Sequence, residues 1–207
     1  MTVTKITELS KSRVRITTDE EFAFVLYKGE LRLYRLKEGQ EIPETVYTEI
    51  TEQLLPKRAK LRAMNLLKAR PYTTKQLTDK LLQGGYPQEI ADVAISYVAS
   101  YGYLNDRQYA SDYIECYKEA KTRSQMLNAL LQKGVNKQII EECFEELLSE
   151  NGGDLEREQI FTWMRKKKFN PVEASFEEKQ KFCAFLYRKG FQIDSIRNAL
   201  SLDITSI

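Results

Sequence analysis

The side chains best suited to bind a charged partner are the cations of one predicted helix that begins near Lys57. Four of them share one side of that helix, with alanines and leucines opposite: Lys57, Arg58, Arg62 and Lys68. Guanidinium and ammonium groups in such a stripe can hold nucleic-acid phosphates or the carboxylates of an acidic protein. A solvated helix face would carry the same charges, and Lys60 interrupts the division, so the pattern leaves both interpretations open.

The net charge of +2 hides a segregated distribution. The stretch 57–82 holds eight basic residues and one acidic residue, whereas 137–158 holds eight acidic and two basic residues. A basic run follows at 165–168, where a helix C-terminus would favour it. Trp163 and Met164 beside it are more typical of a core than of a platform for base stacking, and both interpretations stay open. Because segregated charge says more about partners than the total does, near neutrality does not exclude a nucleic-acid or acidic partner.

Catalytic and metal chemistry find little support in the sequence. The chain has no histidine, which excludes Ser-His-Asp and Cys-His catalysis and histidine metal ligation. No Cys-x-x-Cys pair occurs, and we expect core or subsurface thiols at three positions: Cys116, Cys143 and Cys183. Gly84-Gly85 lacks the frame of a phosphate loop, and the glutamates of 141–146 are typical of a solvated helix face. We therefore predict no catalytic residue, no metal site and no cofactor.

The elements that must position the cations begin with a β-rich segment, residues 1–42. Alternating β-branched and polar residues predict strands over 2–9, 12–18, 22–28 and 30–36. The connections between them are short, which favours antiparallel pairing of neighbouring strands. This segment is therefore expected to form a small antiparallel sheet.

Beyond Pro43 the sequence becomes helical and repeats itself. A first helix should start at Pro43 and end at Pro56, because proline fits a first helical turn and breaks a helix interior. Three glycines then follow similar amphipathic stretches and predict left-handed helix ends: Gly85, Gly134 and Gly190. A capping box begins each stretch: Thr73 with Gln76, Thr122 with Gln125, and Ser175 with Glu178. A leading helix and a second amphipathic helix flank each stretch, which predicts three tandem three-helix units.

The predicted fold class is mainly α: three tandem three-helix repeats in an elongated, curved array, preceded by a small antiparallel β-sheet. The predicted divisions are the sheet over 1–42, a linking helix over 43–56, and repeats over 57–104, 105–153 and 154–207. No apolar run approaches the roughly 20 residues of a membrane span, and the N-terminus lacks the apolar segment of a secretion signal. We therefore expect a cytoplasmic protein without membrane contact. We also expect a monomer, although no residue pattern fixes the oligomeric state.

Several stretches of the helical region resemble the RecX family of recombination regulators. Residues 66–87 fit the leading repeat of that family through Leu66, Leu67, Arg70, Thr73, Leu77, Lys80, Leu81 and Gly85. Residues 101–110 fit a more specific motif through Gly102, Tyr103, Leu104, Asn105, Asp106, Tyr109 and Ala110. A later element matches Leu130, Lys133, Gly134 and Val135. The basic residues common before the second capping box are fewer here, with Glu119 among Lys118, Lys121 and Arg123.

This resemblance implies a non-enzymatic modulator of the RecA recombinase. Such proteins bind RecA and its filaments on single-stranded DNA, and they restrain filament growth, ATPase activity and strand exchange. Contact with the single strand would be weak and independent of base sequence. The basic surface implied for such contacts comprises Arg58, Arg62, Arg70, Lys75, Lys80, Arg123, Lys133 and Arg188. Asp106, Gly85 and Gly134 are expected to be structural.

Two other functions remain open from the residues alone. The stretch 73–98 looks like a helix-turn-helix of a DNA-binding transcription regulator, with a candidate recognition helix after Gly85. That helix carries Glu89 and Asp92 and no lysine or arginine, whereas a helix that reads bases normally offers cationic or amide side chains. The third hypothesis is a helical-repeat scaffold for protein partners that does not bind DNA.

Overall fold

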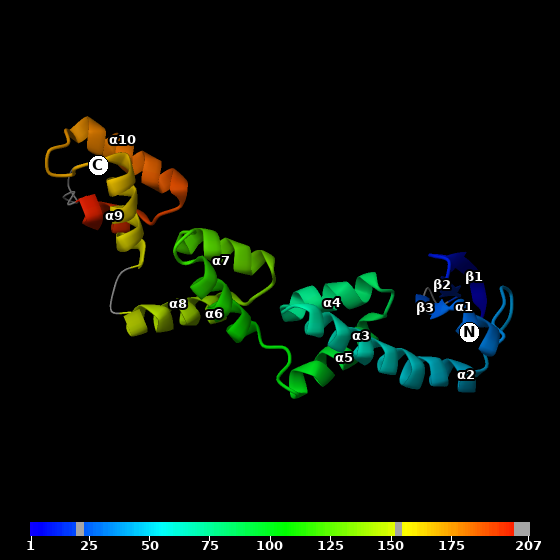
Figure 1. Cartoon of the computed structure of the whole chain (residues 1–207). Helices are drawn as coiled ribbons and strands as arrows, with labels where there is room; N and C mark the ends of the chain where they lie inside the picture. Colours follow the sequence, from blue (N-terminus) through cyan, green and yellow to red (C-terminus); the bar gives the residue numbers. More distant parts are fainter. Residues whose placement is uncertain (20–22, 152–154, 201–207) are drawn as a thin grey trace. The chain divides into compact units, whose positions relative to one another are not determined.

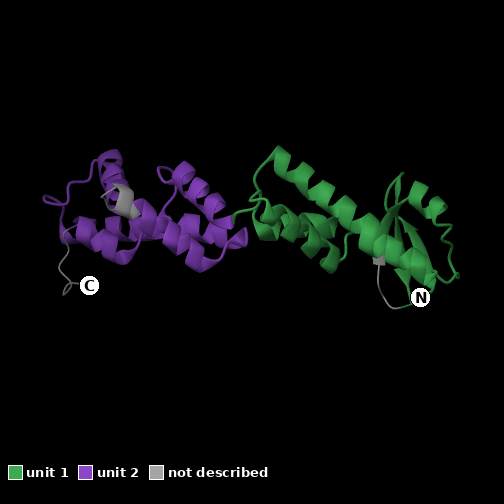
Figure 2. Ribbon diagram, turned by 90° about the horizontal axis from the view of Figure 1, so that it is seen from below, with its two compact units in different colours: residues 1–105 green, residues 106–207 purple. Residues whose placement is uncertain are grey.

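The protein, seen here as a computed structural model, is described at residues 1–19, 23–151 and 155–200. It packs as two compact units, residues 1–105 and residues 106–207 (Figure 2). Phe22 of the third predicted strand and residues 201–207 of the last predicted repeat lie outside the described residues. The five-part division predicted from the sequence, and the elongated, curved arrangement of the repeats, remain predictions.

The N-terminal segment forms a three-stranded antiparallel sheet in the order β1-β2-β3. Its strands are β1 (Val3–Glu8), β2 (Arg13–Thr18) and β3 (Ala23–Tyr27). Val14 pairs with Leu26 and Ile16 pairs with Phe24 across β2 and β3, and all four side chains are buried. Alternation along β2 therefore turns one apolar face toward the core, as period-two patterning predicts.

The fourth predicted strand, 30–36, is wrong. The chain instead turns into the helix α1 (Lys28–Leu33) directly after β3. The Glu30 carboxylate accepts a 2.7 Å hydrogen bond from the Tyr27 N–H, which satisfies a donor at the helix start. Leu33, which strand alternation would have placed with Leu31, is 72% exposed. Local capping at Glu30 thus outweighs the alternating pattern.

The predicted helix end at Pro56 is also wrong. The helix α2 (Glu44–Thr48) continues through a π-helical segment, η1 (Glu49–Leu54), into α3 (Leu55–Ala69), and Figure 1 shows α2 running directly into α3. The Leu55 N–H donates to the Ile50 carbonyl, five residues back. A widened turn before Pro56 accommodates a residue that has no N–H and whose ring would crowd an α-helical turn, so the helix passes through it.

Nine helices of the described chain form the three tandem triplets that the repeats predict. The first triplet is α3, α4 (Thr74–Gln83) and α5 (Gln88–Ser100). The second is α6 (Asp106–Tyr117), α7 (Arg123–Gln132) and α8 (Lys137–Asn151). The third is α9 (Leu155–Lys167), α10 (Phe176–Lys189) and α11 (Ile193–Leu200). The fold class, a small antiparallel sheet followed by three helical triplets, is confirmed.

The helix boundaries follow the predicted caps. All three predicted capping boxes form, with the side chains of Thr73, Thr122 and Ser175 accepting from the N–H three residues on. Gly85, Gly134 and Gly190 take left-handed conformations, with φ of 88°, 86° and 94°. Capping signals at both ends of the middle helix therefore define where that helix begins and ends in all three triplets.

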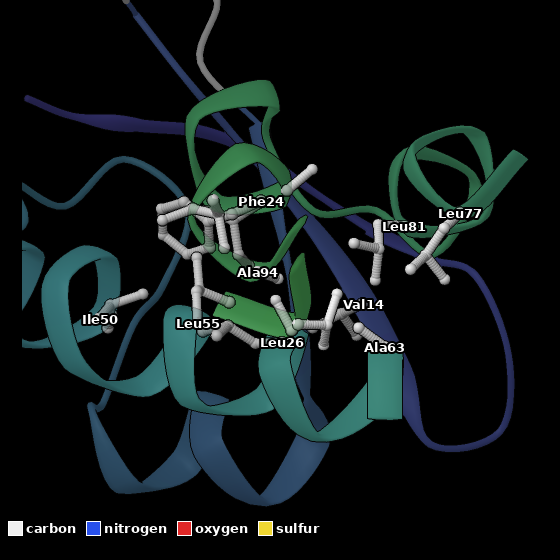
Figure 3. Packing of buried hydrophobic residues seen from close by; sticks show 14 of the residues in the cluster. Val14, Phe24, Leu26, Ile50, Leu55, Ala63, Leu77, Leu81 and Ala94 are labelled. Carbon is white, nitrogen blue, oxygen red and sulfur yellow. The ribbon is translucent and has the colours of Figure 1, made fainter. Parts of the chain in front are cut away.

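Buried hydrophobic side chains of the described residues form three clusters. One joins the sheet to the first triplet, and Figure 3 shows Val14 and Leu26 of the sheet beside Leu55 and Ala63 of α3. The second triplet encloses its own cluster around Ile114 and Leu130, and the third encloses another around Ile160 and Leu186. The sheet and first triplet thus share a core, whereas the later triplets have one core each.

Two of the three predicted interior thiols lie inside. Cys143 and Cys183 are buried, and burial raises the pKa of the Cys183 thiol. Cys116 is exposed, so the prediction is wrong at that position. The helix α6 buries Ala110 and Ile114, and residue 116 lies about 200° around the helix axis from Ile114, which turns it outward.

Candidate interface

Exposed cations line the helix pair α3–α4 of the first triplet. Arg62 on α3, Arg70 at its C-terminal end, and Lys75 and Lys80 on α4 are all exposed. They face outward because α3 buries Ala59 and Ala63, and α4 buries Leu77 and Leu81. Lys75 and Lys80 lie about 140° apart around the α4 axis, so they belong to different sides of that helix.

The cations of α3–α4 differ in how they are held. The Arg70 guanidinium lies 4.0 Å from the Tyr72 ring centroid, and Lys80 Nζ donates to Gln83 Oε1 at 3.3 Å. Lys75 Nζ forms an ion pair with Asp79 Oδ2 at 2.9 Å. Within the described part of the chain, Arg62, Arg70 and Lys80 form no salt bridge. Their charges are therefore available to an external anion, and the exposed Lys75–Asp79 pair is weak enough to be exchanged.

Arg58 is held inside the first unit instead. Its side chain is 17% exposed, and Nη1 forms a 2.8 Å ion pair with Glu30 Oε2. The guanidinium also lies 4.4 Å from the Tyr27 ring centroid and 5.9 Å from that of Tyr86. Burial raises the pKa of the Tyr86 hydroxyl beside it. Arg58 thus joins α3 to α1 through Glu30 and to the end of β3 through Tyr27, a role that its position in the basic stripe did not reveal.

The remaining predicted site residues belong to the second unit. Arg123 Nη2 pairs with Glu141, and its guanidinium lies 4.8 Å from the Phe144 ring centroid. Lys133 Nζ lies 5.8 Å from the Tyr113 ring centroid. Arg188 on α10 is exposed and donates from Nε to its own helix at the Ala184 carbonyl, 3.3 Å away. Five of the predicted residues therefore lie in the first unit, where Arg58 is mostly buried and the other four are exposed, and these three lie in the second.

The acidic face of α8 is linked to arginines of neighbouring helices. Arg107 of α6 forms ion pairs with Glu142, at 2.6 Å, and with Glu146. The hydrogen bond from Arg107 lowers the pKa of the Glu142 carboxyl below its ordinary value. The glutamates remain partly solvated, as predicted, but they also help to hold α8 against α6 and α7.

A cleft in the second unit was missed by sequence reasoning. It has a volume of about 970 Å³ and lies between the α6–α7 connection and α9 with the segment after it. Aromatic and cationic side chains line it together: Lys121, Phe161, Trp163, Arg165, Lys166, Lys168 and Phe169. The only sequence signal was Trp163 beside the basic run 165–168, and that run is also typical of an ordinary helix end. Met164 is buried as predicted, whereas Trp163 is partly exposed.

Neither a membrane span nor a metal centre is found among the residues that the structure describes. No helix there is long and apolar enough to cross a bilayer. No three metal-ligating side chains gather there either.

Comparison with known proteins places these features in one family. The sequence model for the first three-helix domain of RecX matches residues 59–97, and that for the third matches 154–200. The regulatory protein RecX of Caldanaerobacter subterraneus subsp. tengcongensis is 33% identical over 204 residues, which cover 98% of this chain and 100% of that protein. The regulatory protein RecX of Clostridium botulinum (strain Eklund 17B / Type B) is 30% identical, with 95% and 94% covered.

Solved structures show the same fold. A crystal structure of regulatory protein RecX has a TM-score of 0.60 and 21% identity, and the match covers 98% of this chain and 99% of that one. The structure of RecX from Lactobacillus salivarius has a TM-score of 0.61 and 22% identity, with 71% and 95% covered. Similarity along nearly the whole sequence, together with the matched helical triplets, shows that this chain belongs to the RecX family of regulatory proteins.

Proposed function

We propose that this protein is a non-enzymatic regulator that binds the RecA recombinase and its filament on single-stranded DNA. Binding would inhibit filament growth, and with it the ATPase activity and strand exchange. The observation that carries the proposal is the nearly full-length similarity to regulatory RecX proteins. The exposed cations of α3–α4, Arg62, Arg70 and Lys80, support it because a nucleoprotein filament offers both phosphates and protein carboxylates.

The proposed interface uses the predicted cations according to how they are held. Arg62, Arg70, Lys75 and Lys80 would make direct contacts from the first unit. Arg123, Lys133 and Arg188 would extend the contacts in the second unit, although Arg123 must then share its guanidinium with Glu141. Arg58 would act indirectly by holding α3 against α1 through Glu30. Opposite charge would steer the encounter, so the association rate should fall as salt rises.

The competing DNA-reading function has less support. The helix α5 follows Gly85 where a recognition helix would stand, but Glu89 and Asp92 are exposed on its first turns. Carboxylates there would be repelled by the phosphates on either side of a major groove, and this repulsion would lower the affinity of the protein for any duplex. The described residues also give no reason to prefer the third hypothesis, a scaffold for protein partners that does not bind DNA, over a protein that binds the filament through exposed cations.

Inhibition of the DNA-dependent ATPase of RecA tests the proposal. The wild-type protein should lower ATP hydrolysis on single-stranded DNA, and the Arg62→Glu/Lys80→Glu variant should need about tenfold more protein for equal inhibition. Lys11→Glu/Lys37→Glu is the matched control, because it makes the same charge change at exposed positions of the first unit. Absence of inhibition by the wild-type protein would refute the function. Equal losses in both variants would refute the α3–α4 assignment.

Binding titrations separate the three functions. Labelled single-stranded DNA, duplex DNA and a RecA filament are each titrated at two salt concentrations. We expect the filament to bind most tightly and the single strand to bind weakly and without base preference. Sequence-specific duplex binding would support the transcription regulator, and indifference to every nucleic acid would support the scaffold.

A further inference from the structure

The second and third triplets meet through polar contacts that leave a cleft between them. The Gln159 side-chain amide on α9 donates to the Lys118 carbonyl and, at 2.9 Å, to the Lys121 carbonyl. The Gln125 side-chain amide donates to the Lys189 carbonyl at 3.1 Å. Because each triplet has its own hydrophobic cluster, this joint consists of hydrogen bonds rather than a shared core. The cleft of about 970 Å³ beside Gln159 is at the upper end of the roughly 300–1,000 Å³ typical of ligand sites.

Aromatic rings form part of the cleft wall. Phe161 is 39% exposed, and Trp163 is partly exposed and held edge-on by Phe185, with 5.4 Å between ring centroids. Phe169, another residue of the wall, is held in place because its ring stacks on that of Phe182, with 4.1 Å between the ring centroids. Lys166 Nζ and Lys189 Nζ lie 5.3 Å and 5.0 Å from the Trp163 ring centroid. Rings supported from behind, with cations in front of them, can stack on flat groups that carry negative charge.

Cations outnumber carboxylates around the same cleft. Arg165, Lys166 and Lys168 are exposed and form no salt bridge with a described residue. Lys121 lies on the opposite wall, and its hydrogen bond to the Tyr113 hydroxyl raises the pKa of its ammonium group, which keeps it charged. Two carboxylates, Glu119 and Glu158, also line the cleft. Four cations against two carboxylates leave the site positive.

We propose that this cleft binds single-stranded nucleic acid, with bases stacked on Phe161 and Trp163 and phosphates held by Arg165, Lys168 and Lys121. Unpaired bases offer the flat faces that the rings can stack on, whereas bases in a duplex are already stacked on one another. The exposed lysines over Trp163 have flexible side chains, so they can move to a phosphate when a base occupies the ring face. An acidic protein segment would use the cations but not the rings. This inference rests on the proposed function and names where the single strand binds.

Trp163 makes the test direct, because it is the sole tryptophan of the chain. A fluorescein-labelled oligothymidylate is titrated with the full-length protein and followed by anisotropy, and unlabelled oligothymidylate is titrated against tryptophan fluorescence. We expect the strand to quench Trp163, with a midpoint that matches the anisotropy curve. Binding by anisotropy without any change in Trp163 emission would overturn the cleft assignment.

Charge and ring variants complete the test. Arg165→Glu/Lys168→Glu should weaken binding of the oligonucleotide at least about tenfold, and Phe161→Ala should weaken it about fivefold or more. Lys137→Glu/Lys181→Glu, with the same charge change at exposed positions of the second unit outside the cleft, should stay within about twofold. Equal losses in the cleft and control variants would overturn the proposal. Circular dichroism and urea unfolding confirm that each variant is folded.

The RecA ATPase measurement distinguishes failure of this site from failure of the proposed function. If the cleft variants bind the oligonucleotide like the wild-type protein while the wild-type protein still inhibits RecA, the cleft assignment fails and the regulator stands. If the wild-type protein neither inhibits RecA nor binds the strand, the proposed function itself fails. Quenching of Trp163 by RecA without DNA, and not by the oligonucleotide, would assign the cleft to a protein partner and overturn the proposal.

Discussion

Gly85 lies against Val25 so closely that a Cβ at position 85 would be 2.2 Å from Val25 Cγ2. The glycine ends α4 with φ of 88°, and Val25 belongs to β3. Its missing side chain therefore serves two purposes, since it permits the left-handed backbone and lets the turn after α4 touch the sheet. This contact ties the helix that carries Lys75 and Lys80 to the sheet.

The substitution Gly85→Ala should destabilise the first unit by about 2–4 kcal/mol. Left-handed strain accounts for about 1–2 kcal/mol and overpacking against Val25 for the rest. Gly102→Ala is the matched control, because φ is 72° there and no described atom beyond the two neighbouring residues lies within 4 Å of the added Cβ. It should lose only about 1 kcal/mol. Urea unfolding followed by circular dichroism measures both, and equal losses would show that the contact with Val25 does not matter.

A second substitution isolates the contact. Val25→Ala removes the methyl group that the new Cβ would meet, so it should partly rescue Gly85→Ala. The double-mutant cycle should give a favourable coupling of at least about 1 kcal/mol. Strictly additive losses would contradict the packing argument.

Local signals explain how much of the fold the sequence predicted. Glycine at a left-handed helix end and Thr73 three residues before Gln76 act within one turn, so the residues alone reveal them. The segment 30–36 was mispredicted because Glu30 caps a helix and pairs with Arg58, a residue 28 positions away. Pro56 was misread because its effect depends on the π-helical segment before it. Errors arose where a distant contact or an unusual turn outweighed the local pattern.

Arg58 and Arg62 should separate stability from binding. They lie one helical turn apart on α3, but only Arg58 is mostly buried and paired with Glu30. Arg58→Ala should lower the free energy of unfolding by about 1–3 kcal/mol, because it leaves the Glu30 carboxylate mostly buried without its partner. Arg62→Ala should change it by no more than about 0.5 kcal/mol.

The Glu30→Gln variant checks that interpretation. If the pair is the cause, Glu30→Gln should also destabilise the protein, and combining it with Arg58→Ala should add less than the sum of the two losses. Urea unfolding of the four proteins provides the numbers. If Arg58→Ala had the same free energy of unfolding as the wild-type protein, Arg58 would instead be counted among the residues that contact a partner directly.

The Arg107–Glu142 pair should make stability depend on pH. Its hydrogen bond lowers the folded-state pKa of Glu142 below the ordinary value of 4.5. A lowered carboxyl pKa contributes stability above the unfolded value, and that contribution is lost as pH falls through the folded value. Wild type should therefore exceed Glu142→Gln in stability at about pH 6, and the difference should shrink as pH falls below about 4.5.

Glu145 provides the control for this pH dependence. It is exposed on the same helix and forms no salt bridge with a described residue. Glu145→Gln should leave the stability difference from wild type small at every pH. Urea midpoints measured across the pH series decide the matter, and a constant gap between wild type and Glu142→Gln would contradict the ion-pair explanation.

The candidate interface was predictable only in part. A basic stretch stands out in composition, so the first-unit cations could be named from the sequence. The ion-pair partners of these cations could not be named in the same way. Glu30 pairs with Arg58 and Asp79 pairs with Lys75, and only Asp79 lies on the same helix as its partner. The cleft was hidden because one wall contains Lys121 and the other Trp163, which are 42 positions apart in the sequence and lie in different triplets.

Salt dependence should reveal whether the α3–α4 cations contact phosphates. For single strands, each neutralised phosphate adds about 0.7 to the slope of log affinity against log salt concentration. If Arg62, Arg70 and Lys80 each hold a phosphate, replacing all three by alanine should reduce that slope by about 2. Lys75→Ala should reduce it less, because Asp79 already shares that charge. Anisotropy of a labelled oligothymidylate at four salt concentrations gives the slopes.

A weaker affinity with an unchanged slope would mean that the three cations act through protein structure rather than through phosphates. An unchanged slope and affinity, combined with a loss of RecA inhibition, would mean that they contact RecA instead of DNA.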